Sequence, residues 1–268
     1  MGRAALSIAV LGGLAALVLW SGLPVQNWLL YFPGRAPLGD VTRGGLAAWP
    51  SEGDFRGLVA EPAGTPRATA VIFHGNAGHA GHRRFYAEAL VPAGVRVILA
   101  EYPGYGPRDG KLGEAWFLED ARATVQRAYA RHGAPLIVMG ESLGASVAAG
   151  AAGLEGDRAA ALWLITPWDR LVNVAKHHYP WAPVGLLLRD RYDSVERLST
   201  FDRPVLVDVA EHDEIVPARF GQALYESLQA PKRLRLMPGA RHNDWPVTAD
   251  EGWWRAALDF LLDAPGKS

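Results

Sequence analysis

Residues 136–149 read LIVMGESLGASVAA: an apolar run, a Gly-x-Ser-x-Gly pentapeptide and a stretch of small residues. This order predicts a strand, a sharp turn at Ser142 and a helix. In such a turn the serine takes a strained backbone conformation. Gly140 and Gly144 lack the Cβ atoms that would collide with the strand and the helix. The stretch therefore predicts a nucleophilic serine at the carboxyl edge of a sheet.

The rest of the chain alternates between strand-like apolar runs and segments with helical spacing. The expected strands are residues 55–60, 70–73, 95–100, 136–139, 161–165, 205–210 and 234–236. The expected helices are residues 82–92, 118–133, the stretch after Ser142, residues 218–228, and a last helix that a capping box of Thr248 and Glu251 begins. The alternation predicts an α/β fold with a mostly parallel central sheet and helices on both faces.

Composition limits the function. The net charge is −1 without a Lys/Arg stripe, which argues against a nucleic-acid partner because phosphates demand a basic face. The chain has no cysteine, which removes disulfides and thiolate catalysis. Apolar residues make up 49% of the chain, enough for a large core.

The first residues are apolar and carry almost no charge. No charged residue occurs from Ala4 to Gly34, and residues 4–23 are long enough for a bilayer-spanning helix that stops at Pro24. We expect residues 1–24 to be a membrane anchor, or in the alternative reading a cleaved signal peptide. The anchor would make this a single-pass membrane protein with an extracytoplasmic catalytic domain. Residues 25–50 are expected to form a linker, and residues 51–268 the catalytic domain.

A serine hydroxyl needs a base within hydrogen-bond reach and a third group that orients the base. Asp213 follows the expected strand at 205–210, and His242 follows the one at 234–236. The chain order Ser, Asp, His with both partners after strands predicts a triad with Ser142. Glu211 and Asp208 remain alternative acids.

Acyl transfer also needs donors for the developing oxyanion. We expect the backbone N–H groups of Leu143, at the start of the helix, and Asn76, in the loop after residues 70–73, to supply them. His79 and His82 have a spacing that a metal site could use, but a third ligand is not visible. We therefore expect no metal and no cofactor.

The segment at residues 167–204 is long for a plain connection between strands. It carries much apolar surface, and Pro180 and Pro183 forbid one long helix. We expect a lid-like insertion in which Trp168 and Trp181 wall an apolar acyl pocket. The alternative is that these side chains pack on the sheet.

Six motifs occur in order: NWLLYFP at 27–33, FHGNAG at 73–78, YPGYG at 102–106, GESLG at 140–144, HDEIVP at 212–217 and GARHND at 239–244. With them, residues 25–262 resemble the α/β-hydrolase superfamily, in particular the small membrane-anchored serine hydrolases of the bud-emergence-protein-like branch. The resemblance implies an α/β-hydrolase fold with Ser142 as nucleophile, Asp213 as acid and His242 as base. Ala210 and Pro103 depart from the branch, whose members often carry Gly and Arg there.

The expected function is a serine hydrolase that cleaves a carboxylic ester or thioester through an acyl-enzyme. The expected partners are a small-molecule or lipid-like ester and, through the anchor, a membrane. A serine peptidase related to prolyl oligopeptidases is the alternative enzyme, because the same triad serves both. A non-catalytic membrane scaffold is the alternative outside enzymes, although a scaffold has no physical need for three catalytic groups. The branch does not supply a substrate.

Overall fold

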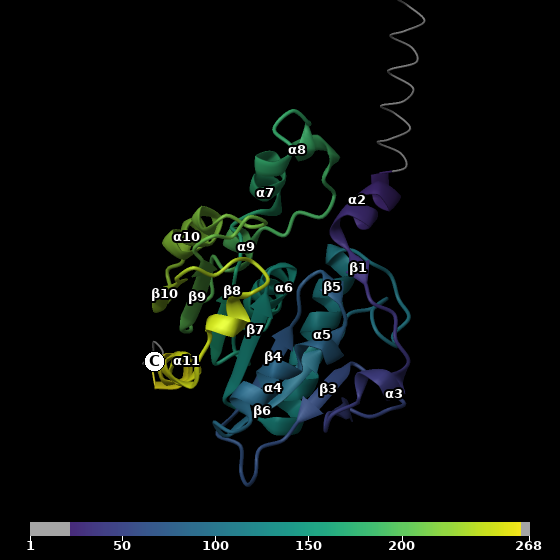
Figure 1. Ribbon diagram of the computed structural model, residues 1–268, viewed down its shortest axis with the longest axis vertical. Coiled ribbons are helices and arrows are strands. Elements are labelled where there is room, and N and C mark those ends of the chain that lie inside the picture. The colour runs from purple at the N-terminus through teal and green to yellow at the C-terminus, as the bar shows by residue number, and fades with distance from the viewer. Residues whose placement is uncertain (1–21, 264–268) are drawn as a thin grey trace, which may run out of the picture.

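The computed structural model describes residues 22–263 of the chain. Among these residues, eight strands form one sheet in the order β10-β9-β8-β7-β4-β6-β3-β2 (Figure 1). The strands from β10 to β6 are parallel, and β3 and β2 are antiparallel at one edge. The strands are β2 (Ala47–Trp49), β3 (Gly57–Ala60), β4 (Ala68–Phe73), β6 (Val95–Ala100), β7 (Leu136–Glu141), β8 (Ala161–Ile165), β9 (Val205–Ala210) and β10 (Lys232–Met237). The expected mostly parallel central sheet is confirmed.

Helices cover both faces of the sheet (Figure 1). One core cluster packs under α5 (Glu114–His132), α6 (Leu143–Leu154), α9 (Ser194–Arg197) and α10 (Ala218–Ser227). The other packs under α3 (Leu38–Val41), α4 (Arg84–Leu90) and α11 (Glu251–Asp263). Strands β4, β7, β8 and β9 are buried along their whole length, which explains why their sequences are continuous apolar runs rather than alternating ones.

Strand β4 lies where the chain changes direction across the sheet. From β4 the chain passes through α4 to β6 on one side, and from β6 it passes through α5 to β7 on the other side. At such a switch point the loops after the two central strands separate, and a crevice opens outside their carboxyl ends. Phe73 pairs with Gly140, so β4 and β7 end at the same level. The loop after β4 and the turn at Ser142 therefore meet at this crevice.

The turn between β7 and α6 has the strained geometry that the pentapeptide predicts. Ser142 has φ 52° and ψ −118°, in a region that residues with a side chain rarely adopt. A Cβ atom on Gly140 would lie 2.0 Å from the carbonyl oxygen of Gly144. One on Gly144 would lie 2.0 Å from the carbonyl oxygen of Phe73. Both glycines are required because the backbones of strand and helix touch here.

Residues 25–50 are more structured than the expected linker. Helix α2 (Gly22–Leu30) runs past Pro24, where we expected a stop, and β1 (Phe32–Pro33) pairs with β5 (Ala77–Gly78). Helix α3 and strand β2 follow. The proline and glycine content suggested a linker, but Val41, Leu46 and Trp49 are buried in the core. Burial of these apolar side chains fixes the segment on the domain.

The expected location as a single-pass membrane protein is corrected. No helix within residues 22–263 is long and apolar enough to cross a membrane. The expected spanning segment, residues 4–23, lies outside the described residues except for its last two positions. The extracytoplasmic placement depended on that span and is withdrawn with it.

The cap of α11 also differs from expectation. The side chain of Asp250 accepts a hydrogen bond from the N–H of Trp253, at 2.7 Å, as an N-cap does. The hydroxyl of Thr248 donates instead to the carbonyl of Trp245. Thr248 and Asp250 are both residue types that can cap a helix, so the sequence alone does not distinguish them. In the structure Thr248 belongs to a 3₁₀ turn over Trp245–Thr248, which leaves Asp250 as the cap.

Substituting Gly144→Ala should lower the free energy of unfolding by about 1–3 kcal/mol, because the new Cβ must push the start of α6 off β4. Urea unfolding measures the change. Gly39→Ala in α3 is the matched control, because its Cβ would meet nothing within 4 Å. Equal stability of Gly144→Ala and the wild type would contradict the close approach.

Candidate active site

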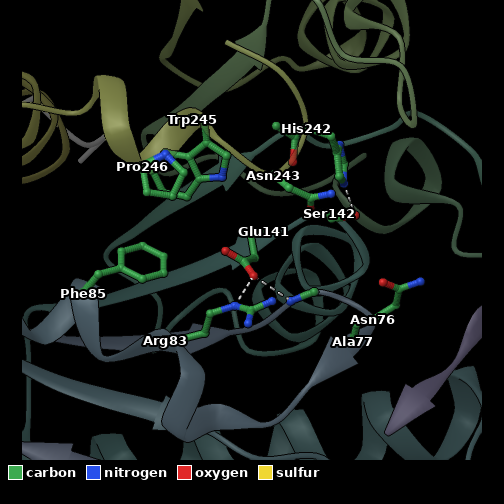
Figure 2. Close-up of a pocket in the computed structure, with 12 residues that line it drawn as sticks. Asn76, Ala77, Arg83, Phe85, Glu141, Ser142, His242, Asn243, Trp245 and Pro246 are labelled. Carbon is green, nitrogen blue, oxygen red and sulfur yellow. Dashed lines mark hydrogen bonds and ion pairs between the residues drawn. The ribbon is translucent and has the colours of Figure 1, made fainter. Parts of the chain in front are cut away.

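Ser142, His242 and Asp213 form one hydrogen-bonded chain at the carboxyl edge of the sheet. The hydroxyl oxygen of Ser142 lies 2.9 Å from Nε2 of His242 (Figure 2). Nδ1 of His242 lies 2.7 Å from Oδ2 of Asp213. The three residues come from the loops after β7, β10 and β9. The structure thus brings together three groups that the sequence separates by up to 100 residues.

The carboxylate of Asp213 is fixed by its own loop. Oδ1 accepts the N–H groups of Ile215, at 3.0 Å, and Val216, at 2.6 Å. Both Asp213 and His242 are buried. Since Oδ1 is engaged, Oδ2 is left for the imidazole, and the carboxylate accepts a proton that Nδ1 carries. This leaves Nε2 of His242 free to accept from Ser142.

The two alternative acids lie elsewhere. Asp208 is fully buried within β9, where Arg235 holds both of its oxygens and the indole N–H of Trp163 lies 2.6 Å from one. Burial raises the pKa of Asp208 despite these donors. Glu211 is exposed and accepts the N–H of Gly239. Neither carboxylate reaches His242 in the structure.

The expected oxyanion donors flank Ser142. Leu143 is the first residue of α6, and Asn76 lies in the loop after β4. Among the described residues, neither N–H group donates to a protein acceptor. The neighbouring N–H of Gly75, by contrast, is taken by the carboxylate of Glu141 at 3.0 Å. Two unused backbone donors therefore remain beside the serine.

The loop that carries Asn76 is braced from behind. Nδ1 of His74 donates to the carbonyl of Gly75 at 2.7 Å. That carbonyl and the N–H of Asn76 belong to one trans peptide unit and point in opposite directions. The carbonyl of Asn76 accepts the N–H of Phe32, at 2.9 Å, and the hydroxyl of Tyr105, at 2.8 Å. These bonds fix the peptide planes on both sides of the Asn76 residue.

His74 is itself held by a buried acid. Nε2 of His74 lies 3.0 Å from Oε1 of Glu101, and both side chains are about 1% exposed. Oε2 of Glu101 accepts the N–H of Ala80 at 3.0 Å. The hydroxyl of Tyr102 donates to the carbonyl of His74 at 2.6 Å. The FHGNAG and YPGYG motifs thus meet as one polar network under the loop.

A cavity of about 260 Å³ opens beside Ser142. It is lined by Gly75, Asn76, Ala77, Arg83, Phe85, Glu141, Ser142, Thr166, His242, Asn243, Trp245 and Pro246. Figure 2 shows the rings of Phe85, Trp245 and Pro246 gathered at one end, with Ser142 at the other. Phe85 and Trp245 pack edge to face with ring centroids 5.8 Å apart. The cavity therefore joins a polar end at Ser142 and His242 to an apolar end.

Glu141, the residue before Ser142, lies between these two ends with Arg83 (Figure 2). Its Oε1 accepts from the Nε of Arg83 and the N–H of Gly75, and its Oε2 accepts the hydroxyl of Tyr86 at 3.0 Å. Burial alone would raise the pKa of Glu141. The charge of Arg83 and the three hydrogen bonds outweigh burial, so its pKa lies below the usual range.

The structure corrects the expected acyl pocket, because neither tryptophan lines the cavity at Ser142. Trp168 is buried in the core, where its indole N–H donates to the carbonyl of Tyr192. Trp181 is 82% exposed. Residues 167–204 form three short helices, α7 (Leu171–His178), α8 (Val184–Leu187) and α9. Part of the segment packs on the sheet, as the alternative reading held.

Ser142, His242 and Asn76 are predicted site residues that line the cavity, but sequence reasoning missed several of the other lining side chains. Arg83 and Phe85 stand on either side of the start of α4, and Trp245 follows His242 by three residues. Glu141 is part of the pentapeptide, but it occupies a position at which the motif allows any residue, so the motif did not predict a role for it. The sequence still carries a signal for Glu141, because an acidic residue at the end of a strand that is buried along its whole length needs a cationic partner.

The rings of His79 and His82 lie side by side with centroids 3.7 Å apart and an angle of 34° between their planes. Burial lowers the pKa of both rings. Within residues 22–263, no group of three or more His, Cys, Asp or Glu side chains is placed to hold a metal ion.

Comparisons with known proteins place these features in a family. The model of the family "Serine aminopeptidase, S33" matches residues 64–184. An uncharacterized protein of Mycobacterium tuberculosis is 34% identical over 88% of this chain and 86% of its own length. The protein bem46 of Schizosaccharomyces pombe is 26% identical over 74% of this chain and 68% of its own length. The lysophosphatidylserine lipase ABHD12 of Danio rerio is 31% identical over 61% of this chain and 48% of the lipase.

Solved structures share the fold. Est1E from Butyrivibrio proteoclasticus, determined with ferulic acid bound, superposes with a TM-score of 0.61 at 20% identity, over 76% of this chain and 94% of that one. The monoacylglycerol lipase of Paleococcus ferrophilus superposes with a TM-score of 0.58 at 22% identity, over 76% and 98%. At these identities the likeness extends to the fold alone.

Glu141→Gln should lower the free energy of unfolding at pH 7 by about 3 kcal/mol, because Arg83 loses a buried counter-charge. The folded-state pKa of Glu141 is lower than its ordinary value of 4.5, so its contribution is present above pH 4.5 and is lost as the pH falls through the folded pKa. The difference from the wild type should therefore shrink below pH 4.5 in urea unfolding. The exposed Glu119→Gln is the control. A difference that grows with acid would contradict the pairing.

Proposed function

From the premise that the chain belongs to the α/β-hydrolase superfamily, in the bud-emergence-protein-like branch, and is a serine hydrolase, we propose that it cleaves carboxylic esters or thioesters through an acyl-enzyme on Ser142. The observation that carries the proposal is the hydrogen-bonded chain from Ser142 through His242 to Asp213 beside a cavity. Two of the similar proteins have lipase names, and lipases cleave carboxylic esters.

In the first step, the Oγ of Ser142 attacks the carbonyl carbon and its proton passes to Nε2 of His242. The imidazolium that forms is stabilised by the buried carboxylate of Asp213, 2.7 Å from Nδ1. Collapse of the tetrahedral intermediate breaks the bond to the leaving oxygen or sulfur, which takes the proton from Nε2. A water then repeats the sequence on the acyl-enzyme and releases the acid.

The negative charge that develops on the carbonyl oxygen needs donors that are already in place. In our proposal the N–H groups of Leu143 and Asn76 supply them. The two are unused by the described protein, and the helix α6 points its N-terminal end toward the same oxygen. Because His74 and Glu101 brace the loop, Asn76 would not have to reorganise during the reaction.

Wild-type enzyme assayed with p-nitrophenyl butyrate, butyrylthiocholine and alanine p-nitroanilide separates ester, thioester and amide cleavage. We expect turnover of the first two. Turnover of the anilide alone would favour the peptidase alternative, which the description of the matching family model also suggests.

Ser142→Ala should lose labelling by a fluorophosphonate probe and lower kcat for the butyrate ester by about 10⁴-fold or more. The matched control is Ser146→Ala, one turn along α6, whose buried hydroxyl bonds Ser194 at 3.0 Å. Ser146→Ala should label like the wild type. Full labelling of Ser142→Ala would place the nucleophile elsewhere.

Glu101→Gln should lower kcat more than it raises KM, because a looser Asn76 loop weakens binding of the oxyanion and not of the ground-state ester. Ester kinetics together with the thermal unfolding midpoint measure this. An increase in KM at constant kcat would mean that the buried pair shapes the cavity and not the oxyanion donors. Glu61→Gln, an exposed acid paired with Arg96, serves as the control.

A further inference from the structure

Arg83 presents unused donors to the cavity at Ser142. The residue ends a 3₁₀ turn over Ala80–Arg83, and its side chain is 20% exposed. Its Nε donates to Glu141. Within the described part of the chain, no acceptor is bonded to its two terminal nitrogens, which carry four N–H groups. The end of the guanidinium fork is therefore available to a ligand.

Glu141 has little acceptor capacity left for a ligand, because three donors already bind its carboxylate. Both of its oxygens are engaged, Oε1 by Arg83 and Gly75, and Oε2 by Tyr86. Its side chain is 9% exposed, less than half the exposed fraction of Arg83. Besides His242, Arg83 and Glu141 are the ionisable side chains among the described lining residues. The free N–H groups of Arg83 thus face the cavity without a carboxylate partner for each of them.

A substrate that enters the cavity displaces the water that would solvate these N–H groups. An ester with only an alkyl chain would leave them without acceptors, which costs binding free energy. A carboxylate or phosphate matches them, because two of its oxygens can each accept from one terminal nitrogen of the guanidinium in a planar pair of hydrogen bonds.

We propose that the free end of Arg83 binds a carboxylate or phosphate group of the substrate, so that the enzyme prefers esters that carry an anionic group besides the scissile bond. The inference rests on the proposed function and deepens it. Arg83 lies between Ser142 and the rings of Phe85 and Trp245 (Figure 2), so the anionic group would sit between the scissile bond and the apolar end of the cavity.

Two matched pairs of esters test the preference and separate the acyl side from the alcohol side. Mono-p-nitrophenyl adipate and p-nitrophenyl hexanoate have acyl chains of equal length and differ by one carboxylate. Hexanoylglycerol phosphate and monohexanoylglycerol differ by a phosphate on the alcohol. We expect kcat/KM to be at least about tenfold higher for the anionic member of one pair.

Arg83→Lys keeps a positive charge beside Glu141 and loses the planar fork, so it can fold where a neutral substitution would leave Glu141 without a counter-charge. The ratio of kcat/KM between the anionic and the neutral ester should fall about tenfold in this variant. Arg84→Lys is the matched control. Arg84 is the next residue, lies outside the cavity lining and donates to the carbonyl of Arg43. The ratio of kcat/KM between the anionic and the neutral ester should therefore be the same in Arg84→Lys as in the wild type.

Binding without turnover separates this inference from the proposed function. Ser142→Ala cannot form the acyl-enzyme, so the affinities for intact mono-p-nitrophenyl adipate and p-nitrophenyl hexanoate can be compared with and without Arg83→Lys. A preference for the adipate that Arg83→Lys removes would support the anion site, even if the wild type hydrolysed neither ester. Equal kcat/KM for the anionic and the neutral member in both pairs of esters, or a preference that Arg83→Lys leaves intact, would overturn the anion site and leave the hydrolase standing.

Discussion

The site depends on how closely the first turn of α6 approaches the end of β4. The Cα of Gly144 lies so near the carbonyl oxygen of Phe73 that no Cβ fits there. A Cβ on Gly140 would likewise collide with the carbonyl oxygen of Gly144, in the first turn of the helix. This contact places Ser142 on a strained backbone directly beside the loop that carries Asn76. Because Leu143 begins the helix, the same contact sets the separation between the two expected oxyanion donors. Helix-to-strand packing and catalytic geometry are therefore one constraint.

The loop after β4 has its supports in distant parts of the chain. Phe32, just after the first described helix, and Tyr105, after β6, both bond the carbonyl of Asn76. Glu101 holds His74, which in turn holds the carbonyl of Gly75. The N–H groups of this loop that face the cavity must stay without a protein acceptor. The carbonyl groups on its other side therefore need hydrogen bonds that hold them, since otherwise a peptide unit could rotate and pair its N–H within the protein. This explains why short motifs that lie far apart in the sequence meet around one serine in the fold.

The sequence predicted what depends on local pattern and chain order. The strands and the strained turn follow from apolar runs and glycine spacing, and the pairing of Asp213 with His242 follows from their positions after successive strands. It failed where tertiary packing decides. Trp168 and Trp181 have the same chemistry, yet one is buried in the core and the other is exposed, and neither lines the cavity. No periodicity separates those outcomes, because each depends on which neighbour covers the ring.

The side chain of Glu141 both stabilises the fold and orients a residue of the cavity. A carboxylate at the end of a buried strand must be compensated, and Arg83, Gly75 and Tyr86 do this together. Gly75 precedes Asn76, so the same carboxylate steadies the loop beside the nucleophile. Arg83 needs only its Nε for the pair, so compensation of the buried acid orients the rest of the guanidinium along the cavity. The residue before the serine, which the pentapeptide does not specify, thus sets the direction in which Arg83 presents its free N–H groups.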